Sequence, residues 1–270
     1  MRVIVPIKQV PETNAVKMDE ETGTMIREGI EAIINPLDLY AIEIAIRLRE
    51  LRSAGAETAG TVAVSMGPPK AITALREALA MGIDSAVLIS DKAFAGSDTW
   101  ATSYVLAAAI RRIGEYDLVI CGERATDGDT GQVGPGIASW LNLPVVTYVG
   151  KIDQLTEKTC RVHRLVEEGY EVLEVQLPAV LTVVKEIADP RLPTLRGKQK
   201  AKRAEIPTWT PGDLEVETGK LGLDGSPTRV VKIFRPKVAR ECRKVAALDE
   251  EAIHSAVDQL VAFLQEKELI

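Results

Sequence analysis

The first half of the chain alternates short apolar runs with stretches in which apolar residues recur at helical spacing. Val3, Val5 and Ile7 alternate with other residues at the start, a pattern typical of a β-strand. After the Asn35-Pro36 turn, apolar positions from residue 37 to residue 51 follow a helical period, which predicts a helix ending near Gly55. The chain therefore begins with a strand, a loop and a helix.

Further units of the same kind follow. Their apolar, strand-like runs lie at residues 61–66, 86–90 and 117–121. Between the last two, Ser97 or Asp98 is expected to cap a helix that runs to Ile113. This rhythm predicts parallel strands joined by right-handed crossovers. Before the first helix, β-like pieces on either side of residues 20–23 indicate a hairpin.

Beyond Trp140 the pattern changes to β-like runs separated by turn residues. They lie at residues 145–152, 159–165, 170–177 and 179–184. We expect them to form an antiparallel, β-rich edge of the same sheet. From Lys185 onward proline and charge dominate, so we expect an extended arm that ends in an amphipathic helix capped at Asp249. The apolar face of that helix carries Ile253, Val257, Leu260 and Leu264.

Composition narrows the class of protein. A chain of 270 residues that is 46% hydrophobic and 27% charged is typical of a globular α/β protein with one main domain. No apolar run approaches the roughly 20 residues that a membrane-spanning helix needs. The net charge of −6 argues against nucleic acid as the main partner. The start of the chain shows no leader pattern, so we expect a cytoplasmic location.

The cysteines and histidines do not indicate a metal site. Cys121, Cys160 and Cys242 are an odd number without a CxxC pair, and we interpret each as a small apolar residue in a reducing compartment. His163 and His254 are too few and too far apart for a zinc motif. We therefore expect chemistry without a metal ion.

The stretch CGERATDGDTGQVGPGIASWL is the most informative part of the sequence. A glycine-rich loop after a strand and before a helix lets backbone N–H groups approach a phosphate. Thr130 and Gln132 add neutral donors, whereas Asp127 and Asp129 either orient the loop or accept hydrogen bonds from ribose hydroxyls. The alternative interpretation is an ordinary β–α turn with helix caps. The Gly134-Pro-Gly136 fragment is a weak match to a dinucleotide fingerprint because the third glycine is missing.

Several strand ends can converge on one adenosine. In an open α/β sheet, ligands bind beyond the carboxyl ends of the strands, where strand order reverses. The pieces available there are Pro6 to Val10, Asn35, Met66 to Pro68 and Gly122 to Val133. We find no nucleophile elbow, P-loop or pyrophosphatase loop. The sequence therefore indicates a binder whose cofactor carries the chemistry.

Five motifs, in order along nearly the whole chain, resemble the β subunit of electron-transfer flavoproteins. They are VPIKQVP, INPLDLYAIEIAIRLRE, VSMGPP, CGERATDGDTGQVGP and DPRLPTLRGKQKAKRAEI. The resemblance implies a doubly wound parallel α/β sheet like that of the adenine-nucleotide alpha-hydrolases, with an antiparallel β extension and a C-terminal arm. It implies a nucleotide-binding domain at 1–184, a partner-recognition loop and basic segment at 185–204, and an arm and helix at 205–270 that contact the α subunit.

The resemblance also implies the cofactor site. It comprises Pro6, Asn35, Pro36, Asp38, Met66, Gly122, Asp127, Gly128, Asp129, Thr130, Gly131, Gln132 and Val133. Simple carriers of the family hold AMP there and serve acyl-CoA dehydrogenases, whereas flavin-bifurcating relatives hold a second FAD and take electrons from NADH. We expect FAD and electron bifurcation, with AMP as the alternative. No side chain is expected to act as a catalyst.

Specific residues favour the bifurcating and nitrogen-fixation-associated branch. They include DGDTGQVGP, LRGKQKAK and residues 225–228, and Thr13, Asn14 and Leu37 depart from the simple branch. The partners implied are the α subunit, an acyl-CoA dehydrogenase or other flavoprotein dehydrogenase, and ferredoxin or flavodoxin. Two alternatives from other classes are a stand-alone sensor of the universal-stress type and a nucleotide-alpha-hydrolase enzyme, but the features that either would need are not visible.

Leu195 is the candidate contact with the dehydrogenase. It is an apolar residue between Pro193 and Arg196 in a polar, proline-stiffened loop, as an exposed anchor would be, and the resemblance places it in the family's recognition loop. The alternative is a leucine folded into the core of the chain. The cations that follow Leu195 indicate either a solvated face or a surface for an acidic partner or phosphate.

Overall fold

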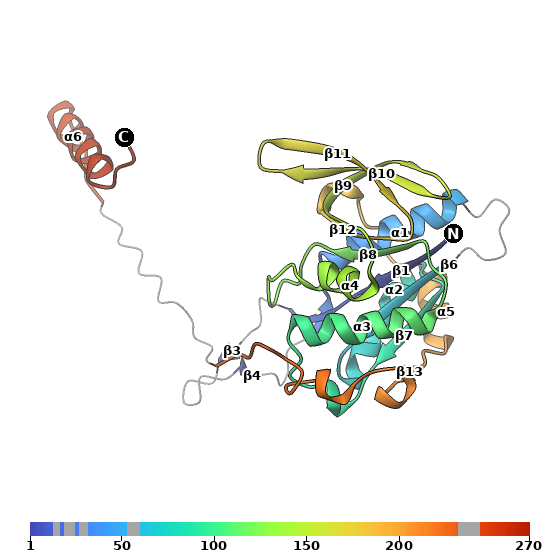
Figure 1. The fold of residues 1–270 in the computed structure, drawn as a ribbon. Helices are drawn as coiled ribbons and strands as arrows, with labels where there is room; N and C mark the ends of the chain where they lie inside the picture. Colours follow the sequence, from blue (N-terminus) through green and yellow to red (C-terminus); the bar gives the residue numbers. More distant parts are fainter. Residues whose placement is uncertain (13–16, 19–24, 27–31, 53–59, 232–243) are drawn as a thin grey trace. The chain divides into compact units, whose positions relative to one another are not determined.

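The computed structural model describes the chain except for residues 13–16, 19–24, 27–31, 53–59 and 232–243. It divides into two compact units, Met1–Val231 and Lys232–Ile270. The first unit holds a sheet of nine strands in the order β11-β10-β9-β12-β8-β1-β6-β7-β13 (Figure 1). The strands are β1 (Arg2–Pro6), β6 (Gly60–Met66), β7 (Ser85–Ile89), β8 (Leu118–Gly122), β9 (Val145–Leu155), β10 (Thr159–Val166), β11 (Gly169–Gln176), β12 (Ala179–Val183) and β13 (Thr208–Trp209).

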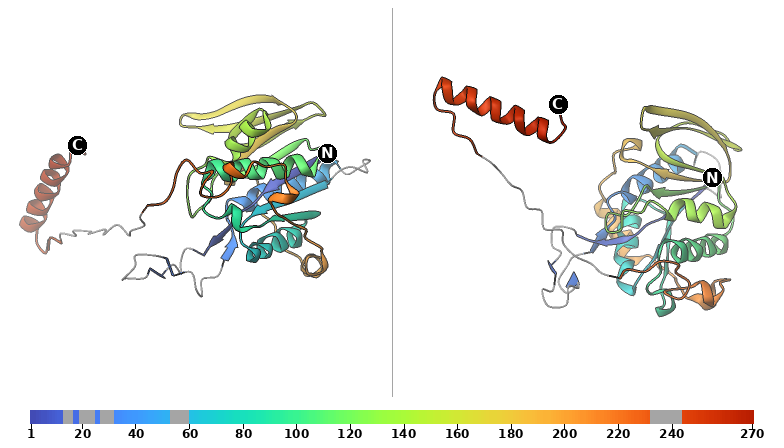
Figure 2. Two further views of the ribbon diagram at one scale, coloured as in Figure 1. Left: turned by 60° about the horizontal axis from the view of Figure 1, so that its bottom comes forward. Right: turned by 60° about the vertical axis from the view of Figure 1, so that its left-hand side comes forward.

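Helices cover both faces of this sheet, which confirms the doubly wound α/β prediction (Figures 1 and 2). One face packs against α1 (Asp38–Arg52), α2 (Ile72–Met81) and α5 (Leu195–Arg203). The other packs against α3 (Thr99–Ile113) and α4 (Val133–Leu141). Each face has its own apolar cluster, so the strands between them are buried from both sides.

Short elements complete the first unit. They are η2 (Pro69–Ala71), η3 (Lys92–Phe94), η4 (Lys185–Ile187), η5 (Pro211–Asp213) and η6 (Thr218–Lys220), with two antiparallel pairs, β2 (Gln9–Pro11) with β5 (Ala32–Ile34) and β3 (Lys17–Met18) with β4 (Met25–Ile26). The β3–β4 pair agrees with the predicted hairpin, whose turn lies outside the described residues.

Helix boundaries follow local capping chemistry. Asp98 caps α3 by accepting hydrogen bonds from the N–H groups of Trp100 (2.9 Å) and Ala101 (3.0 Å), as predicted. Gly82 ends α2 with φ of +131°, a conformation that favours glycine.

The β-rich edge differs from the prediction in one strand. β9, β10 and β11 pair antiparallel, as expected. β12 instead pairs parallel with both β8 and β9 inside the sheet. All five of its residues are buried, and this continuous apolar run is the pattern of an internal parallel strand.

Segment 185–231 is more ordered than an extended arm. Thr194 caps α5 by accepting from the N–H of Gly197 at 2.9 Å, so a helix replaces the expected loop from Leu195 onward. Residues 205–231 belong to the first unit: β13 adds to the edge of the sheet beside β7, and Leu214 and Leu221 are buried. The arm therefore does not begin at residue 205.

The second unit contains α6 (Glu250–Glu266). Asp249 caps it, as predicted, by accepting from the N–H of Ala252 at 2.8 Å. Large apolar side chains along it are about half exposed, among them Ile253, Val257, Leu260 and Phe263. In the described part of the chain, no helix is both long and apolar enough to span a bilayer.

Candidate functional site

Strand order reverses between β1 and β8. From β1 the chain adds β6 and then β7 on one side, whereas β8 and β12 lie on the other. The loops after β1 and β8 therefore diverge at one carboxyl edge, which is where open α/β sheets bind ligands.

Asn35 joins three loops at this edge. It is almost fully buried, and its backbone N–H donates to the carbonyl of Lys8 at 2.8 Å. Its side-chain amide donates to the carbonyl of Arg124 at 2.9 Å, and its Oδ1 accepts from the N–H of Thr126 at 3.1 Å. An amide side chain suits this position because it donates and accepts at once.

Asp38 fastens the loop after β1 to the start of α1. Its buried carboxylate accepts from the N–H of Lys8 at 2.7 Å. Burial raises the pKa of Asp38 to about 7, although the hydrogen bonds from Lys8, Asn35 and Gly122 act in the opposite direction. A Cβ at Gly122 would overlap Oδ1 of Asp38 and lie 2.8 Å from the carbonyl of Leu37, so only glycine fits there.

The two aspartates of the loop after β8 have cationic partners. Asp127 accepts from Nζ of Lys8 at 2.7 Å, and Asp129 lies 3.0 Å from the guanidinium of Arg124. Asp129 (φ +54°) and Gly131 (φ +62°) adopt left-handed conformations that turn the chain into α4. The two aspartates therefore shape the loop, and the two cations compensate their negative charges.

The end of the loop presents free donors. Within the described residues, no hydrogen bond engages the backbone N–H of Thr130, Gly131 or Gln132, which precede α4. Oγ1 of Thr99, at the start of α3, donates to Oε1 of Gln132 at 2.9 Å. Free N–H groups at a helix N-terminus fit an anion such as a diphosphate.

Two glycines let α4 approach its neighbours closely. A Cβ at Gly134 would lie 2.5 Å from Cγ2 of Thr182 on β12, and one at Gly136 would lie 2.6 Å from Oγ of Ser103 on α3. The glycines that resemble a dinucleotide fingerprint therefore serve helix packing.

The remaining candidate residues lie at or near the same edge. Pro6 is buried at the end of β1, Met66 is half-buried at the end of β6, and Pro36 is exposed before α1. Sequence reasoning did not assign roles to Lys8 and Arg124, whose ion pairs hold the loop carboxylates. Lys8 lies within the VPIKQVP motif, whereas its partner Asp127 is 119 residues away.

Other candidate chemistry is limited. The described residues contain no cluster of three or more groups suited to a metal ion. Cys121 and Cys160 are buried free thiols, and burial raises the pKa of each. Cys242 and the branch-specific Thr13 and Asn14 lie outside the described residues.

Leu195 is 82% exposed at the first position of α5. This exposure rules out the alternative that it packs in the core of the chain. The basic residues that follow it, Arg196, Lys198, Lys200, Lys202 and Arg203, are exposed as well.

The chain is similar to known proteins over its whole length. Residues 22–214 match the model of the electron transfer flavoprotein domain. The caffeyl-CoA reductase-Etf complex subunit CarD of Acetobacterium woodii is 45% identical over 100% of both chains. Electron transfer flavoprotein subunit beta of Thermoanaerobacterium thermosaccharolyticum is 47% identical over 96% of this chain and 98% of its own. Protein FixA of Azorhizobium caulinodans is 42% identical, covering 97% and 93%.

Proposed function

The chain belongs to the electron transfer flavoprotein family as a β subunit, and from this premise we propose that its sheet edge between β1 and β8 binds the adenine dinucleotide of FAD. The observation that carries the proposal is the row of backbone N–H groups at Thr130, Gly131 and Gln132 before α4, to which the described part of the chain provides no acceptor. Backbone donors at a helix N-terminus complement a diphosphate without a basic side chain.

The residues around that row hold the loops in place for the nucleotide. Asn35 and Asp38 support the site indirectly. Their side chains are buried and hydrogen-bonded to the loops after β1 and β8, so they hold these loops in position. The segment from Gly122 to Val133 lines the diphosphate, the half-buried Met66 supplies apolar surface beside it, and the buried Pro6 lies at the end of β1 behind that surface. When bound, FAD supplies the redox chemistry, and the protein binds and orients it.

We further propose that this β subunit works in NADH-dependent electron bifurcation with an α subunit, a flavoprotein dehydrogenase and a ferredoxin or flavodoxin. The support is similarity to the caffeyl-CoA reductase-Etf complex subunit and to FixA, which agrees with the branch-specific motifs. The same donors also suit the phosphate of AMP, so a simple AMP-containing carrier for acyl-CoA dehydrogenases is the second candidate.

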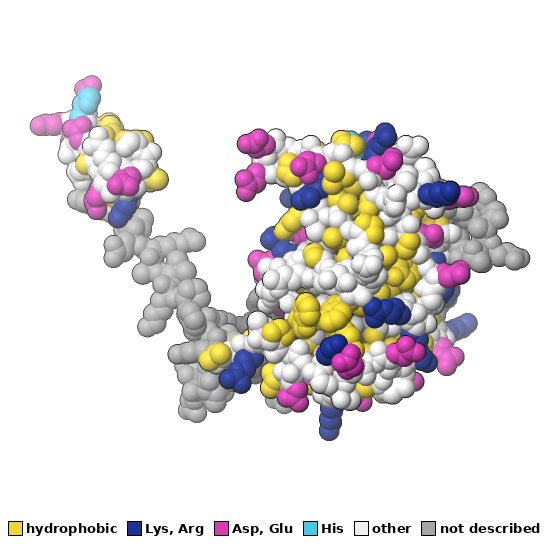
Figure 3. Space-filling view, in the orientation of Figure 1, with side chains coloured by type: hydrophobic (Ala, Val, Ile, Leu, Met, Phe, Trp, Pro, Cys, Tyr) yellow, Lys and Arg dark blue, Asp and Glu magenta, His cyan; other side chains and the backbone are white. Residues whose placement is uncertain are grey.

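Exposed apolar surface supports an α-subunit partner. Figure 3 shows apolar side chains gathered over the face that carries α3 and α4. Trp100 on α3 is 48% exposed, and its ring lies against that of Trp140 with the centroids 4.8 Å apart and the planes tilted by 57°. α6 also offers a half-exposed apolar face. Surfaces of this kind mark protein interfaces, and we assign contact with the α subunit to them, nucleotide binding to residues 1–184 and recognition of the dehydrogenase to residues 185–204.

The proposed reaction is tested with the assembled αβ heterodimer. Bifurcation predicts that NADH oxidation requires a low-potential acceptor and a dehydrogenase with its oxidised substrate at the same time. Turnover with a dehydrogenase alone and no requirement for NADH would instead indicate the simple carrier. The same nucleotide site is compatible with either outcome, because Lys8 and Arg124 compensate the charges of Asp127 and Asp129 beside the phosphate of either nucleotide.

A further inference from the structure

Asp98 holds two parts of the first unit together: the start of α3 and the segment that leads to the second unit. One carboxylate oxygen, Oδ1, caps α3 by accepting from the N–H groups of Trp100 and Ala101. The other oxygen, Oδ2, accepts from the backbone N–H of Thr228 at 3.0 Å and from its hydroxyl at 2.7 Å. The backbone N–H of Asp98 in turn donates to Oγ of Ser226 at 2.8 Å. The two segments are therefore bound in both directions.

The arm root is the segment of residues 222–231, with which the first unit ends. It packs closely on η3, because a Cβ at Gly222 (φ +56°) would overlap the carbonyl oxygen of Ala93. Residues 229–231 are exposed, and in the described part of the chain no hydrogen bond engages them. Among the described residues, the bonds to Asp98 are therefore the last that attach the root before the second unit begins.

The start of α3 also contacts the nucleotide loop. Thr99, the residue after Asp98, donates through Oγ1 to Oε1 of Gln132 at 2.9 Å. Gln132 lies immediately before α4, and its backbone N–H is one of the donors proposed for the diphosphate. A Cβ at Gly136 would lie 2.6 Å from Oγ of Ser103, so α3 and α4 are in close contact. A displacement at the start of α3 is therefore passed on to the donors before α4.

The carboxyl of Asp98 is ionised at neutral pH. Burial raises its pKa, but hydrogen bonds from Ala101, Thr228 and Trp100 outweigh that effect and lower the pKa. Both oxygens are therefore acceptors, and hydrogen bonds to a charged acceptor are stronger than those between neutral groups. A helix cap needs only one of these oxygens. The second oxygen serves a residue 130 positions away in the sequence.

We propose that Asp98 is a positioning residue that couples the arm root to the nucleotide site, so that FAD bound before α4 strengthens the attachment of the root and release of the root weakens the binding of FAD. This inference rests on the proposed nucleotide site and adds the residues that connect it to the arm root. It also gives a role to Ser226 and Thr228, which belong to the branch-specific motif at residues 225–228. Because coupling between two equilibria is reciprocal, both effects have the same factor.

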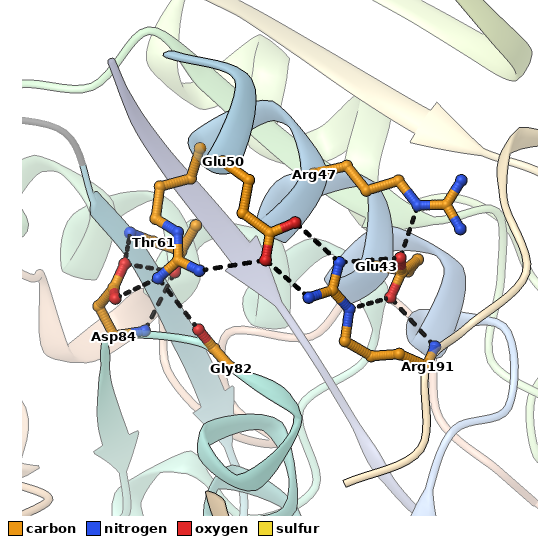
Figure 4. A network of polar contacts seen from close by, with 8 residues as sticks. Glu43, Arg47, Glu50, Thr61, Gly82, Asp84 and Arg191 are labelled. Atoms are coloured by element: carbon orange, nitrogen blue, oxygen red, sulfur yellow. Dashed lines mark hydrogen bonds and ion pairs between the residues drawn. The ribbon is translucent and has the colours of Figure 1, made fainter. Parts of the chain in front are cut away.

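A second aspartate has a similar pattern of contacts at the other edge of the sheet (Figure 4). Oδ2 of Asp84 accepts from the backbone N–H and the hydroxyl of Thr61, both at 2.9 Å, and Arg49 donates to Oδ1. Asp84 precedes β7 at the amino edge of the parallel strands, whereas the nucleotide loop follows β8 at the carboxyl edge. Asp84 is therefore the matched control, because its bonds contribute to stability but do not reach the nucleotide loop.

The first test is titration of the nucleotide-depleted αβ heterodimer with FAD. Thr228→Val removes the hydroxyl from an exposed side chain and keeps its size, and we expect the affinity to fall about fivefold. Thr228→Ser keeps the hydroxyl and should keep the wild-type affinity. Asp98→Asn should also lower the affinity, because its one oxygen serves either the cap or the root but not both. Asp84→Asn should lower Tm and leave the affinity unchanged.

Hydrogen exchange of the same heterodimer tests the reciprocal effect. The amide hydrogens of Asp98 and Thr228 are both bonded between α3 and the root, so their exchange reports directly on release of the root. FAD should slow both about fivefold in the wild-type protein and should have no effect on them in Asp98→Asn.

Three results would overturn the coupling. They are an unchanged FAD affinity in Thr228→Val, an equal loss of affinity in Asp84→Asn, and exchange at Asp98 and Thr228 that does not depend on FAD. AMP is the probe in the same experiments if the β subunit holds AMP, because the donor of Gln132 suits its phosphate as well. A wild-type heterodimer whose β subunit binds neither nucleotide would overturn the proposed nucleotide site itself.

Discussion

Replacing Gly122 by alanine should damage the nucleotide site directly. Gly122 is the last residue of β8, and its Cα faces the start of α1. An added methyl group would overlap Oδ1 of Asp38 and lie 2.8 Å from the backbone of Leu37. Neither neighbour can move freely, since Asp38 is buried and bonded to the N–H of Lys8.

The magnitude follows from the cost of overpacking. Inserting a methyl group into a tight site costs about 1–3 kcal/mol, and for a chain of this size each kcal/mol lowers Tm by about 2–4 °C. If the loop after β1 shifts with Asp38, the donors before α4 lose their alignment with the diphosphate. We expect nucleotide affinity to fall at least about tenfold, or ~1.4 kcal/mol.

Gly128→Ala is the matched control in the same loop. Its Cβ would meet no atom within 4 Å, and its φ is not positive. Differential scanning calorimetry of the αβ heterodimer measures Tm. Titration of the nucleotide-depleted heterodimer with FAD measures the affinity. If Gly122→Ala keeps the wild-type Tm and FAD affinity, the close approach of β8 to Asp38 does not determine the site. The same conclusion follows if Tm and FAD affinity fall equally in Gly122→Ala and Gly128→Ala.

Three further predictions concern the same loop, its buried carboxyl and the partner. Gly131→Val should weaken FAD binding, because a β-branched residue at φ +62° costs about 1–2 kcal/mol, and Asp129→Ala should weaken it more mildly. If titration shows an unchanged FAD affinity for a folded Gly131→Val, the loop is only an ordinary turn. The carboxyl of Asp38 holds its proton up to about pH 7 in the folded protein but only below its ordinary pKa of 3.8 in the unfolded chain. The free energy of unfolding should therefore fall as pH rises from about 4 to 7 and level off above. Asp38→Asn should flatten that slope by up to about 1.4 kcal/mol per pH unit, and identical pH profiles would contradict the raised pKa. The chain expressed alone should be poorly soluble or nucleotide-poor and be rescued by an α subunit, whereas a stable monomer with full nucleotide content in light scattering and absorbance would contradict the obligate partner.

Local patterns predicted most of the fold. The helices at residues 38–52 and 99–113 and the parallel strands between them follow from periodicity and caps, which are local signals. The prediction that β12 is antiparallel is wrong, because an apolar run indicates that a strand is buried but does not show which strands it pairs with. β13 has only two residues, and its pairing with β7 depends on tertiary contacts that no short window contains.

The sequence predicts which segments form the candidate site but not which side chains link them. The glycine-rich loop and the Asn35-Pro36 turn were found as sequence motifs. The ion pair of Lys8 with Asp127 joins residues 119 positions apart, so no local spacing reports it. The basic segment was expected to be a loop because proline and charge dominate it, but the Thr194 cap and the close packing of Gly197 on α2 stabilise a helix there.

The identity and number of nucleotides in the purified αβ heterodimer report directly on whether the β subunit binds FAD between β1 and β8. Acid extraction followed by chromatography gives the amount of FAD and AMP per heterodimer. If the β subunit binds FAD, the heterodimer contains two FAD and no AMP, and the second FAD is lost selectively in Gly122→Ala and retained in Gly128→Ala. One FAD with one AMP would contradict a flavin in the β subunit, and a nucleotide content that is the same in all three proteins would contradict its placement between β1 and β8.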